Sequence, residues 1–345
     1  MKKKIIALFI LMIIPSMFLS CDNRTKKENT PQIVNNKIHI GFAFDSFVIE
    51  RWERDRDVFV STAKELGAQV NVQNANGDVQ EQIEQIEYFI DKGVDVIVIV
   101  SVDSKACKEV VQKAKDKGIY VIAYDRLIEN GNADFYISFD NKEVGRLMAK
   151  TLVDHVPPEG NIVTIFGPQT DYNVTLMEEG FNEVIKDYPL NIVYSVYAKD
   201  WLAEEAFTAI HNALDIEKNI HGVMCGNDNL ASQAVLALSE NRLASKVALT
   251  GQDGDLAAFQ RIVEGTQTMT VYKPVDQLAK CAAALAVNLV KGVDVTPDAY
   301  INDGTYDVPC IILEPIPITR DNIDKIIIEG GVQKKEEVYL NVKYR

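Results

Sequence analysis

Apolar runs of strand length alternate with stretches of helical spacing from residue 37 onward. In the first half of the chain the strand-like runs cover residues 37–44, 69–73, 95–100 and 119–124, and the helical stretches cover about 79–92 and 104–117. Runs rich in Val and Ile are typical of strands that are buried on both faces, as in a parallel sheet covered by helices. The pattern therefore predicts a doubly wound α/β domain.

The same pattern returns later in the chain. The run 161–166 corresponds to the first strand, 222–225 to the run at 95–100, and 247–253 to the run at 119–124, each with an offset of about 120 to 130 residues. A chain of 345 residues also exceeds the usual size of a single hydrophobic core. We therefore expect two doubly wound parallel-sheet lobes, with the carboxyl ends of their strands facing a shared cleft.

Planar polar side chains and two indoles follow these strands. They are Arg51, Trp52, Asp125, Arg126, Asp171, Asn173, Trp201, Asn227 and Asp253. Ligands of open parallel sheets bind outside the carboxyl ends of the strands. Carboxylates, carboxamides and guanidinium groups form paired hydrogen bonds with neighbouring hydroxyls, and an indole matches the C–H face of a sugar. The grouping indicates that the cleft binds a small polyol.

Each of these residues also has an ordinary structural explanation. The segment Glu50–Asp57 is compatible with a solvated helical turn whose charges pair at i, i+3 and i, i+4. An Asp or Asn after a strand is a common helix N-cap, and Trp is commonly a core residue. The recurrence at matching strand ends of both lobes favours a shared site. We assign Arg51 and Trp52 to the ligand, and expect the other charges of this segment to pair along the helix: Glu53, Arg54, Asp55, Arg56 and Asp57.

The N-terminus has the pattern of an export signal. Lys2, Lys3 and Lys4 precede an apolar run that ends at Leu19. Ser20-Cys21 then resembles a bacterial lipoprotein cleavage site, although Phe18 replaces the Leu that is usual there. We expect a signal peptide at 1–20, lipidation of Cys21, and a flexible tether at 21–36; plain secretion and an uncleaved anchor are the alternatives.

The net charge and the spacing of the cysteines and histidines argue against nucleic-acid binding and metal binding. The formal net charge is −14, and loss of the three lysines with the signal makes it −14 − 3 = −17, which argues against nucleic acid as a partner. The five cysteines and four histidines are scattered without metal-ligand spacing. We expect no metal site and no cofactor.

Six segments together resemble the D-xylose-binding proteins of bacterial ABC import systems, which belong to the pentose/hexose group of type I periplasmic binding proteins. The resemblance covers residue 37 to about 331. The segments that carry it are 50–57, 73–77, 123–126, 134–141, 251–255 and 265–274.

The resemblance implies a site and a domain arrangement. The family's ligand-binding positions fall on the nine residues named above and on Lys273. The chain would cross between the lobes near Asn141, Lys273 and Thr305, which joins the two lobes by a three-segment hinge. The N-terminal lobe would comprise 37–140 and about 274–305, and the C-terminal lobe 141–273 and about 306–331, including Val308–Leu313. Residues 332–345 would form a tail beyond the family's usual end.

The function implied is extracytoplasmic binding of D-xylose, or a similar monosaccharide such as a related pentose, with closure of the lobes presenting the loaded form to an ABC permease. The alternative is a subunit that reports the sugar to a membrane histidine kinase. Asp45-Ser-Phe-Val48 stands where transport members often have Asp-Asp-Leu-Arg. The sequence therefore does not decide whether the membrane partner is a permease or a histidine kinase. The protein would be a membrane-anchored lipoprotein on the outer face of the cytoplasmic membrane, or periplasmic.

The sequence argues against two other classes of protein, a glycosidase and a sugar-responsive repressor. Asp253 and Asp255 resemble a glycosidase carboxylate pair, but their i, i+2 spacing gives no reason to expect both to flank one bond, so we expect no enzyme. A sugar-responsive repressor of this fold would need a basic helix-turn-helix segment, and residues 1–36 have the pattern of a signal and tether instead.

Overall fold

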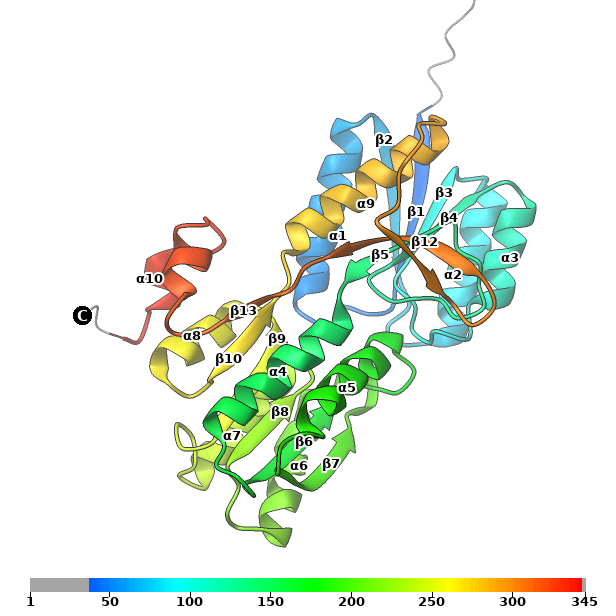
Figure 1. Cartoon of the computed structure of the whole chain (residues 1–345). Coiled ribbons are helices and arrows are strands. Elements are labelled where there is room, and N and C mark those ends of the chain that lie inside the picture. The colour runs from blue at the N-terminus through cyan, green and yellow to red at the C-terminus, as the bar shows by residue number, and fades with distance from the viewer. Residues whose placement is uncertain (1–36, 343–345) are drawn as a thin grey trace, which may run out of the picture. The chain divides into compact units, whose positions relative to one another are not determined.

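The computed structural model describes residues 37–342, so the predicted signal, Cys21 and tether lie outside the described residues. The described part contains two sheets, each covered by helices (Figure 1). The lobe that contains the first sheet is the N-terminal lobe, and the lobe that contains the second is the C-terminal lobe.

The N-terminal lobe has a seven-stranded sheet in the order β11-β12-β5-β4-β3-β1-β2, parallel except for β11. Its strands are β1 (Ile38–Phe44), β2 (Ala68–Asn74), β3 (Val96–Ile99), β4 (Tyr120–Tyr124), β5 (Phe135–Phe139), β11 (Ala299–Asn302) and β12 (Asp307–Leu313). Its helices are α1 (Arg51–Glu65), α2 (Val79–Lys92), α3 (Lys108–Asp116) and α9 (Val275–Val290).

The C-terminal lobe has a six-stranded sheet in the order β13-β10-β9-β8-β6-β7, parallel except for β13. Its strands are β6 (Asn161–Phe166), β7 (Asn191–Tyr197), β8 (Gly222–Cys225), β9 (Ala248–Asp253), β10 (Met269–Tyr272) and β13 (Ile316–Ile318). Its helical segments are α4 (Asn141–His155), α5 (Tyr172–Ile185), η1 (Lys199–Trp201), α6 (Glu204–Ile216), α7 (Asp228–Glu240), α8 (Leu256–Glu264), η2 (Asp324–Ile328) and α10 (Lys335–Val338).

The two sheets share one topology. The parallel core of the first runs β2-β1-β3-β4-β5 and that of the second runs β7-β6-β8-β9-β10, so the internal repeat seen in the sequence is a structural repeat. In this order the crevice for a ligand lies at the carboxyl ends of the central strands. The predicted fold class, with two doubly wound lobes, is confirmed.

Local signals in the sequence account for the elements that frame the cleft. All four residues of β3 are buried, as expected of a β-branched strand covered on both faces. Asp78 caps α2 by accepting hydrogen bonds from the backbone N–H groups of Gln80 and Glu81. Gly93 ends the same helix at φ 65°, in the left-handed region that favours glycine.

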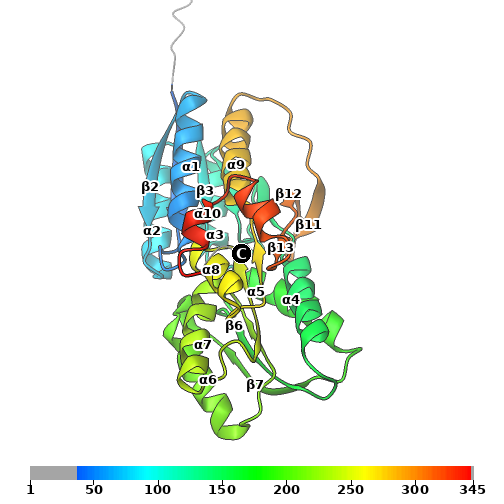
Figure 2. The ribbon, with the colours of Figure 1, turned by 90° about the vertical axis from the view of Figure 1, so that its left-hand side faces the viewer.

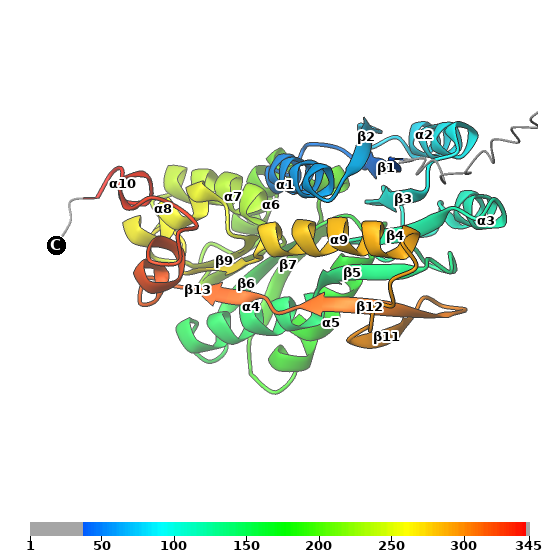
Figure 3. The ribbon, with the colours of Figure 1, turned by 90° about the horizontal axis from the view of Figure 1, so that it is seen from above.

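The chain crosses between the sheets three times: from β5 to α4, from β10 to α9, and from β12 to β13. We expected the segment Val308–Leu313 in the C-terminal lobe, and this is wrong. It forms most of β12, which pairs in parallel with β5 of the N-terminal lobe, so the third crossing follows Leu313 and not Thr305. Figure 3 shows β12 and β13 in succession, each belonging to a different sheet.

Helix α9 completes the N-terminal lobe from a distant part of the sequence. It packs beside α1, as Figures 2 and 3 both show, and it also contacts β4. At this interface Arg54 forms a bidentate ion pair with Asp276, with N–O distances of 2.6 and 3.0 Å. The expectation that Arg54 pairs along its own helix is therefore wrong, because its partner is the carboxylate of Asp276 on the facing helix α9.

The described part of the tail packs on the C-terminal lobe. Val338 is buried in a small apolar cluster with Phe259 and Ile327. The Gln260 side chain donates a hydrogen bond to the backbone carbonyl of Glu337 at 2.9 Å. The tail thus extends the hydrophobic core of that lobe.

Two further findings concern the described residues alone. Within residues 37–342, no helix is long and apolar enough to cross a membrane. In the same range Cys107, Cys225 and Cys310 are buried free thiols, and Cys281 is an exposed one.

Helices α4 and α5 lie side by side at unusually close range (Figure 1). A Cβ atom placed on Gly180 would lie 1.9 Å from the carbonyl oxygen of Lys142, and one on Gly145 would lie 1.9 Å from that of Met177. Because both obstacles are backbone atoms, the helices cannot accept a methyl group at either position without separating.

We predict that Gly180→Ala lowers the free energy of unfolding by about 1–3 kcal/mol, because the added methyl group forces the two helices apart. Urea denaturation measures the change. The control is Thr175→Ala, at an exposed position on the same helix, which should change stability by less than about 0.5 kcal/mol. Equal stability of Gly180→Ala and the wild type would contradict the close packing.

Candidate functional site

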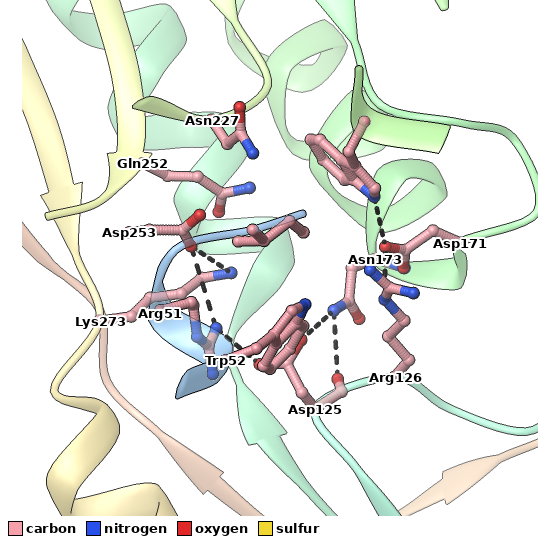
Figure 4. A pocket seen from close by; sticks show the side chains of 12 residues that line it. Arg51, Trp52, Asp125, Arg126, Asp171, Asn173, Asn227, Gln252, Asp253 and Lys273 are labelled. Carbon is pink, nitrogen blue, oxygen red and sulfur yellow. Dashed lines mark hydrogen bonds and ion pairs between the residues drawn. The ribbon is translucent and has the colours of Figure 1, made fainter. Parts of the chain in front are cut away.

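One pocket between the lobes is lined by all ten residues that the sequence and the resemblance single out (Figure 4). Two further lining residues were missed: Ile49 and Gln252. About 290 Å³ of space lies between the lining atoms, including the part that is open to solvent.

The N-terminal lobe contributes the start of α1 and the loop after β4. Arg51 and Trp52 open α1, while Asp125 and Arg126 follow β4 directly. The Arg51 guanidinium carbon lies 4.4 Å from the centroid of the Trp52 ring, and that of Arg126 lies 5.7 Å from it. Both guanidinium groups therefore contact the indole, and these cation–π contacts help to fix its position.

Arg51 is held by a carboxylate that lies behind the pocket. Its Nε and Nη2 atoms donate hydrogen bonds to Asp55 at 3.1 and 3.0 Å, and Asp55 is fully buried. The Tyr124 hydroxyl donates to the same carboxylate. Two of the three guanidinium nitrogens are thereby fixed, and the third, Nη1, lies 2.9 Å from Asp125. Asp55 does pair along the helix, as expected, but it also orients a pocket residue.

Arg126 is held in the same way and reaches across the cleft. Its Nη1 atom donates to Asp45 at 2.7 Å and to the carbonyl of Ser101 at 2.9 Å. Its Nε atom lies 2.7 Å from the carboxylate of Asp171, which belongs to the other lobe. One guanidinium group thus joins the two lobes at the edge of the pocket, as Figure 4 shows.

The C-terminal lobe presents residues that also cap its helices. Asp171 caps α5 by accepting a hydrogen bond from the backbone N–H of Asn173, and Asn227 caps α7 by accepting one from Leu230. The N-cap roles of Asp171 and Asn227 are confirmed, and they are compatible with the predicted ligand-binding roles. The Asn173 side chain also donates across the cleft to the carboxylate of Asp125 at 2.9 Å.

Trp201 is positioned by two glycines and by Asp171. Its Nε1 atom donates to the Asp171 carboxylate at 3.2 Å. A Cβ atom on Gly167 would lie 2.2 Å from the indole, and one on Gly226 would lie 3.1 Å from it. The backbone of Trp201 has φ 58°, a conformation that costs about 1–3 kcal/mol in a non-glycine residue and that is found mainly where the surroundings enforce it.

Asp253 ends β9 at φ 94°, also in the left-handed region. The turn behind it is held by the buried carboxylate of Asp228, which accepts hydrogen bonds from the backbone N–H groups of Gly254 and Asp255 at 3.0 and 3.1 Å. Lys273, at the crossing from β10 to α9, lies 3.8 Å from Asp253. Arg51 of the other lobe lies 3.9 Å from the same carboxylate. Asp253 is therefore the point where both lobes and the hinge meet.

Burial and opposing charges shift the pKa values in this pocket. Burial raises the pKa of Asp171 and that of Asp253, and the nearby cations offset it only in part. For Asp125 burial acts in the same direction, but Arg51, Lys273 and Arg126 outweigh it and the pKa falls below its ordinary value. Burial lowers the pKa of Lys273 against the pull of Asp125 and Asp253. Burial therefore sets the direction of the pKa shift for Asp171, Asp253 and Lys273, and the neighbouring cations set it for Asp125 alone.

The lining side chains are electrically balanced. Arg51, Arg126 and Lys273 carry three positive charges, and three carboxylates, those of Asp125, Asp171 and Asp253, oppose them. Each carboxylate already lies within 4 Å of a cation. The arrangement therefore favours a neutral ligand over a phosphate or an amine.

Several buried polar atoms around this pocket have no hydrogen-bond partner within the described part of the chain. The donors are Trp52 Nε1, Arg126 Nη2 and the Asn227 amide, and the acceptors are the Asn173 and Gln252 amide oxygens. Buried polar groups are normally paired, and each unmade bond costs about 1–3 kcal/mol. These atoms therefore require a ligand that both donates and accepts hydrogen bonds.

Comparison with known proteins identifies the family. Residues 40–294 match the periplasmic binding protein domain. The chain belongs to the periplasmic binding protein family. This family consists of binding proteins and not of enzymes, and it implies a periplasmic location.

Two curated periplasmic binding proteins are similar over most of their length. The D-xylose-binding periplasmic protein of Haemophilus influenzae is 44% identical over 307 residues, which cover 88% of this chain and 92% of that protein. The protein of the same name from Escherichia coli is 44% identical over 88% of this chain and 93% of its own. The resemblance to D-xylose-binding proteins, which the six sequence segments indicate, is confirmed.

A solved structure supports the fold. The carbohydrate transporter solute binding protein of Chloroflexus aurantiacus, in complex with D-glucose, aligns with a TM-score of 0.82 and 27% identity. The alignment covers 87% of this chain and 98% of the other.

The missed residues carry weak sequence signals. Gln252 lies inside the strand run that ends at Asp253, and Ile49 is one aliphatic residue before a charged turn. Gln252 was reachable, because it is a carboxamide beside a predicted site residue at a strand end. Ile49 had no distinguishing signal.

We predict that Gly167→Ala displaces the Trp201 indole and changes its fluorescence emission, because the new methyl group would overlap the ring. The chain contains only two tryptophans, Trp52 and Trp201, so a Trp52→Phe background isolates the signal of Trp201. Ala198→Gly, which adds no atoms nearby, serves as the control for changes in local packing. An unchanged emission maximum in Gly167→Ala would contradict the contact.

Proposed function

We propose that this protein binds D-xylose, or a closely similar neutral monosaccharide, in the pocket between its lobes. The observation that carries the proposal is the combination of balanced buried charges with unpartnered donors and acceptors around one small cavity. A sugar supplies hydroxyl groups that both donate and accept, and it carries no charge. The choice of D-xylose rests on the two relatives that bear its name at 44% identity.

Binding works through closure of the lobes. The contacts Arg126–Asp171, Asn173–Asp125 and Arg51–Asp253 each join one lobe to the other. A sugar that bonds to both lobes at once binds the closed arrangement better than an open one, and so shifts the equilibrium toward closure. Closure is then the signal that a membrane partner recognises.

Selectivity among sugars follows from the cost of unmade bonds. An epimer with one misdirected hydroxyl leaves a buried polar partner such as the Asn227 amide without its bond. Each such loss weakens binding by about 1–3 kcal/mol. The pocket is therefore suited to distinguish pentose epimers.

Titration calorimetry with D-xylose, combined with urea denaturation, tests this function: calorimetry gives the dissociation constant and denaturation gives the stability. At about one hundred times its dissociation constant, the sugar should raise the free energy of unfolding by about 2.7 kcal/mol. Asn227→Ser keeps an oxygen that can cap α7 but removes the amide donor, and should weaken binding at least about tenfold. Asp78→Ser, at the N-cap of α2 away from the pocket, is the matched control and should leave affinity unchanged. Stabilisation by ribose or glucose with none by xylose would reject the assignment.

The downstream partner that we favour is an ABC import permease. The support is that similar proteins are transporter components by name, as in the Chloroflexus structure. A membrane histidine kinase is the alternative, motivated by Asp45-Ser-Phe-Val48 at the rim of the cleft. Cross-linking in membranes followed by affinity purification should recover permease subunits when xylose is present; recovery of a kinase without a permease would reverse this choice.

We further propose that Cys21 carries a lipid that anchors the protein to the outer face of the membrane. The support is the apolar run that ends at Leu19, the Ser20-Cys21 pair that follows it, and the polar segment after Cys21. Cys21→Ser should move the protein from the membrane fraction to the soluble exported fraction while leaving xylose affinity unchanged. Retention of the variant in the membrane fraction would contradict lipidation.

A further inference from the structure

Two carboxamides of the sugar pocket lie next to each other at the ends of neighbouring strands. Asn227 follows β8 and Gln252 is near the end of β9, and these strands pair in parallel. Figure 4 shows both side chains at the same side of the cavity that they line. Asn227 is 1% exposed and Gln252 is 5% exposed, so both amides are almost wholly removed from bulk water. Their hydrogen bonds therefore depend on the protein and on the ligand in the cavity.

A backbone carbonyl fixes the orientation of the Gln252 amide. Its Nε2 atom donates to the carbonyl oxygen of Gly226 at 2.6 Å. A carbonyl oxygen only accepts hydrogen bonds, so the amide nitrogen must face Gly226 and the amide oxygen cannot take its place. The Oε1 atom is buried and has no hydrogen-bond partner within the described residues. The free end of Gln252 is therefore an acceptor.

The helix that follows Asn227 fixes its amide in the opposite sense. The Oδ1 atom accepts a hydrogen bond from the backbone N–H of Leu230 at 2.9 Å, as the N-cap of α7. A backbone N–H only donates, so the amide oxygen must face the helix. The Nδ2 atom is buried and has no partner in the part of the chain that the structure describes. The free end of Asn227 is therefore a donor.

A donor and an acceptor beside one cavity match a single hydroxyl group. The two free ends do not bond to each other, so pairing both of them requires a group between them. A hydroxyl oxygen accepts from an amide N–H while its own hydrogen is donated to an amide oxygen. A ring oxygen or an ether pairs with Asn227 but not with Gln252, because it has no hydrogen to donate. Loss of the hydroxyl leaves two buried polar atoms unpaired at once.

We propose that one hydroxyl of the bound sugar bridges the amides of Asn227 and Gln252, which makes Gln252 a specificity-determining residue of this protein. The inference rests on the proposed function, because it takes D-xylose as the ligand of this pocket. It adds Gln252 to the ligand-binding positions that the family resemblance implies. It also assigns the two amides to the same hydroxyl, so that a sugar without this hydroxyl loses both contacts together.

Removing the hydroxyls of the ligand one at a time tests the inference. Titration calorimetry on the wild-type protein compares D-xylose with its monodeoxy analogues, each of which lacks one ring hydroxyl. Loss of the bridging hydroxyl should weaken binding at least about tenfold. The same sugars are then measured on two variants. Gln252→Met removes the acceptor at similar side-chain length, and Asn227→Ser removes the donor while keeping an oxygen that can cap α7.

The two variants should affect the same hydroxyl. Each should bind D-xylose at least about tenfold more weakly than the wild type. In each, deletion of the bridging hydroxyl should weaken binding by less than about a further twofold, because the contact is already lost. Deletion of any other hydroxyl should weaken binding by the same factor as in the wild type. A purely structural role of Gln252 would weaken the binding of every sugar by one common factor instead.

Gln85→Met is the matched control. Gln85 is also a buried carboxamide whose Nε2 atom donates to a backbone carbonyl, that of Asn74, and its Oε1 atom likewise has no hydrogen-bond partner among residues 37–342. It lies on α2 of the N-terminal lobe and is not among the residues that line the sugar pocket. This variant should leave the affinity for every sugar unchanged.

Three outcomes would overturn the inference while the proposed function stands. Gln252→Met leaves the affinity for D-xylose unchanged, or it weakens the binding of all the sugars alike, or the two variants cancel the effects of different hydroxyls. In the first two cases Gln252 does not bind the sugar, and in the third no single hydroxyl bridges the amides. If the wild-type protein does not bind D-xylose, the proposed function itself fails.

Discussion

The constraint on which the site depends is that its buried charges must stay paired. Arg51, Arg126 and Lys273 are removed from water where the lobes meet, and an unpaired charge there would cost several kcal/mol. The N-terminal lobe therefore holds both of its cations with its own carboxylates: Asp55 fixes Arg51, and Asp45 fixes Arg126. Only the remaining nitrogen atoms are free to face the ligand or the opposite lobe, so this half of the site is arranged by contacts within one lobe.

Contacts across the cleft give these charges further partners. In the closed arrangement Arg126 contacts Asp171 and Arg51 approaches Asp253. In an open arrangement water would replace these contacts, so the gain from the ion pairs is largely offset by the loss of hydration. On the proposed function, a bound sugar would shift the balance toward closure, because its hydroxyls would pair with the polar atoms that the protein alone leaves without partners.

Much of this was predictable from the sequence because strand ends are local features. Asp171 and Asn227 follow apolar runs and begin helices, and the same atoms that cap the helices place the residues at the cleft. The position of β12 was not predictable in this way, since Val308–Leu313 is equally suited to either sheet and its pairing with β5 is a contact over more than 170 residues of sequence. Arg54 was misassigned for a similar reason, because Asp276 lies on a distant helix. Gln252 could have been found from its place beside Asp253 at a strand end, whereas Ile49 could not, because a single aliphatic residue carries no sequence signal of a site.

We propose that a bound sugar holds together two lobes that separate without it. Small-angle X-ray scattering on residues 37–345, with and without saturating D-xylose, tests this directly. We expect a smaller radius of gyration with xylose, and a sugar-bound scattering curve that matches the closed lobes described above. Identical curves with and without the sugar, at a concentration where calorimetry shows full binding, would contradict it.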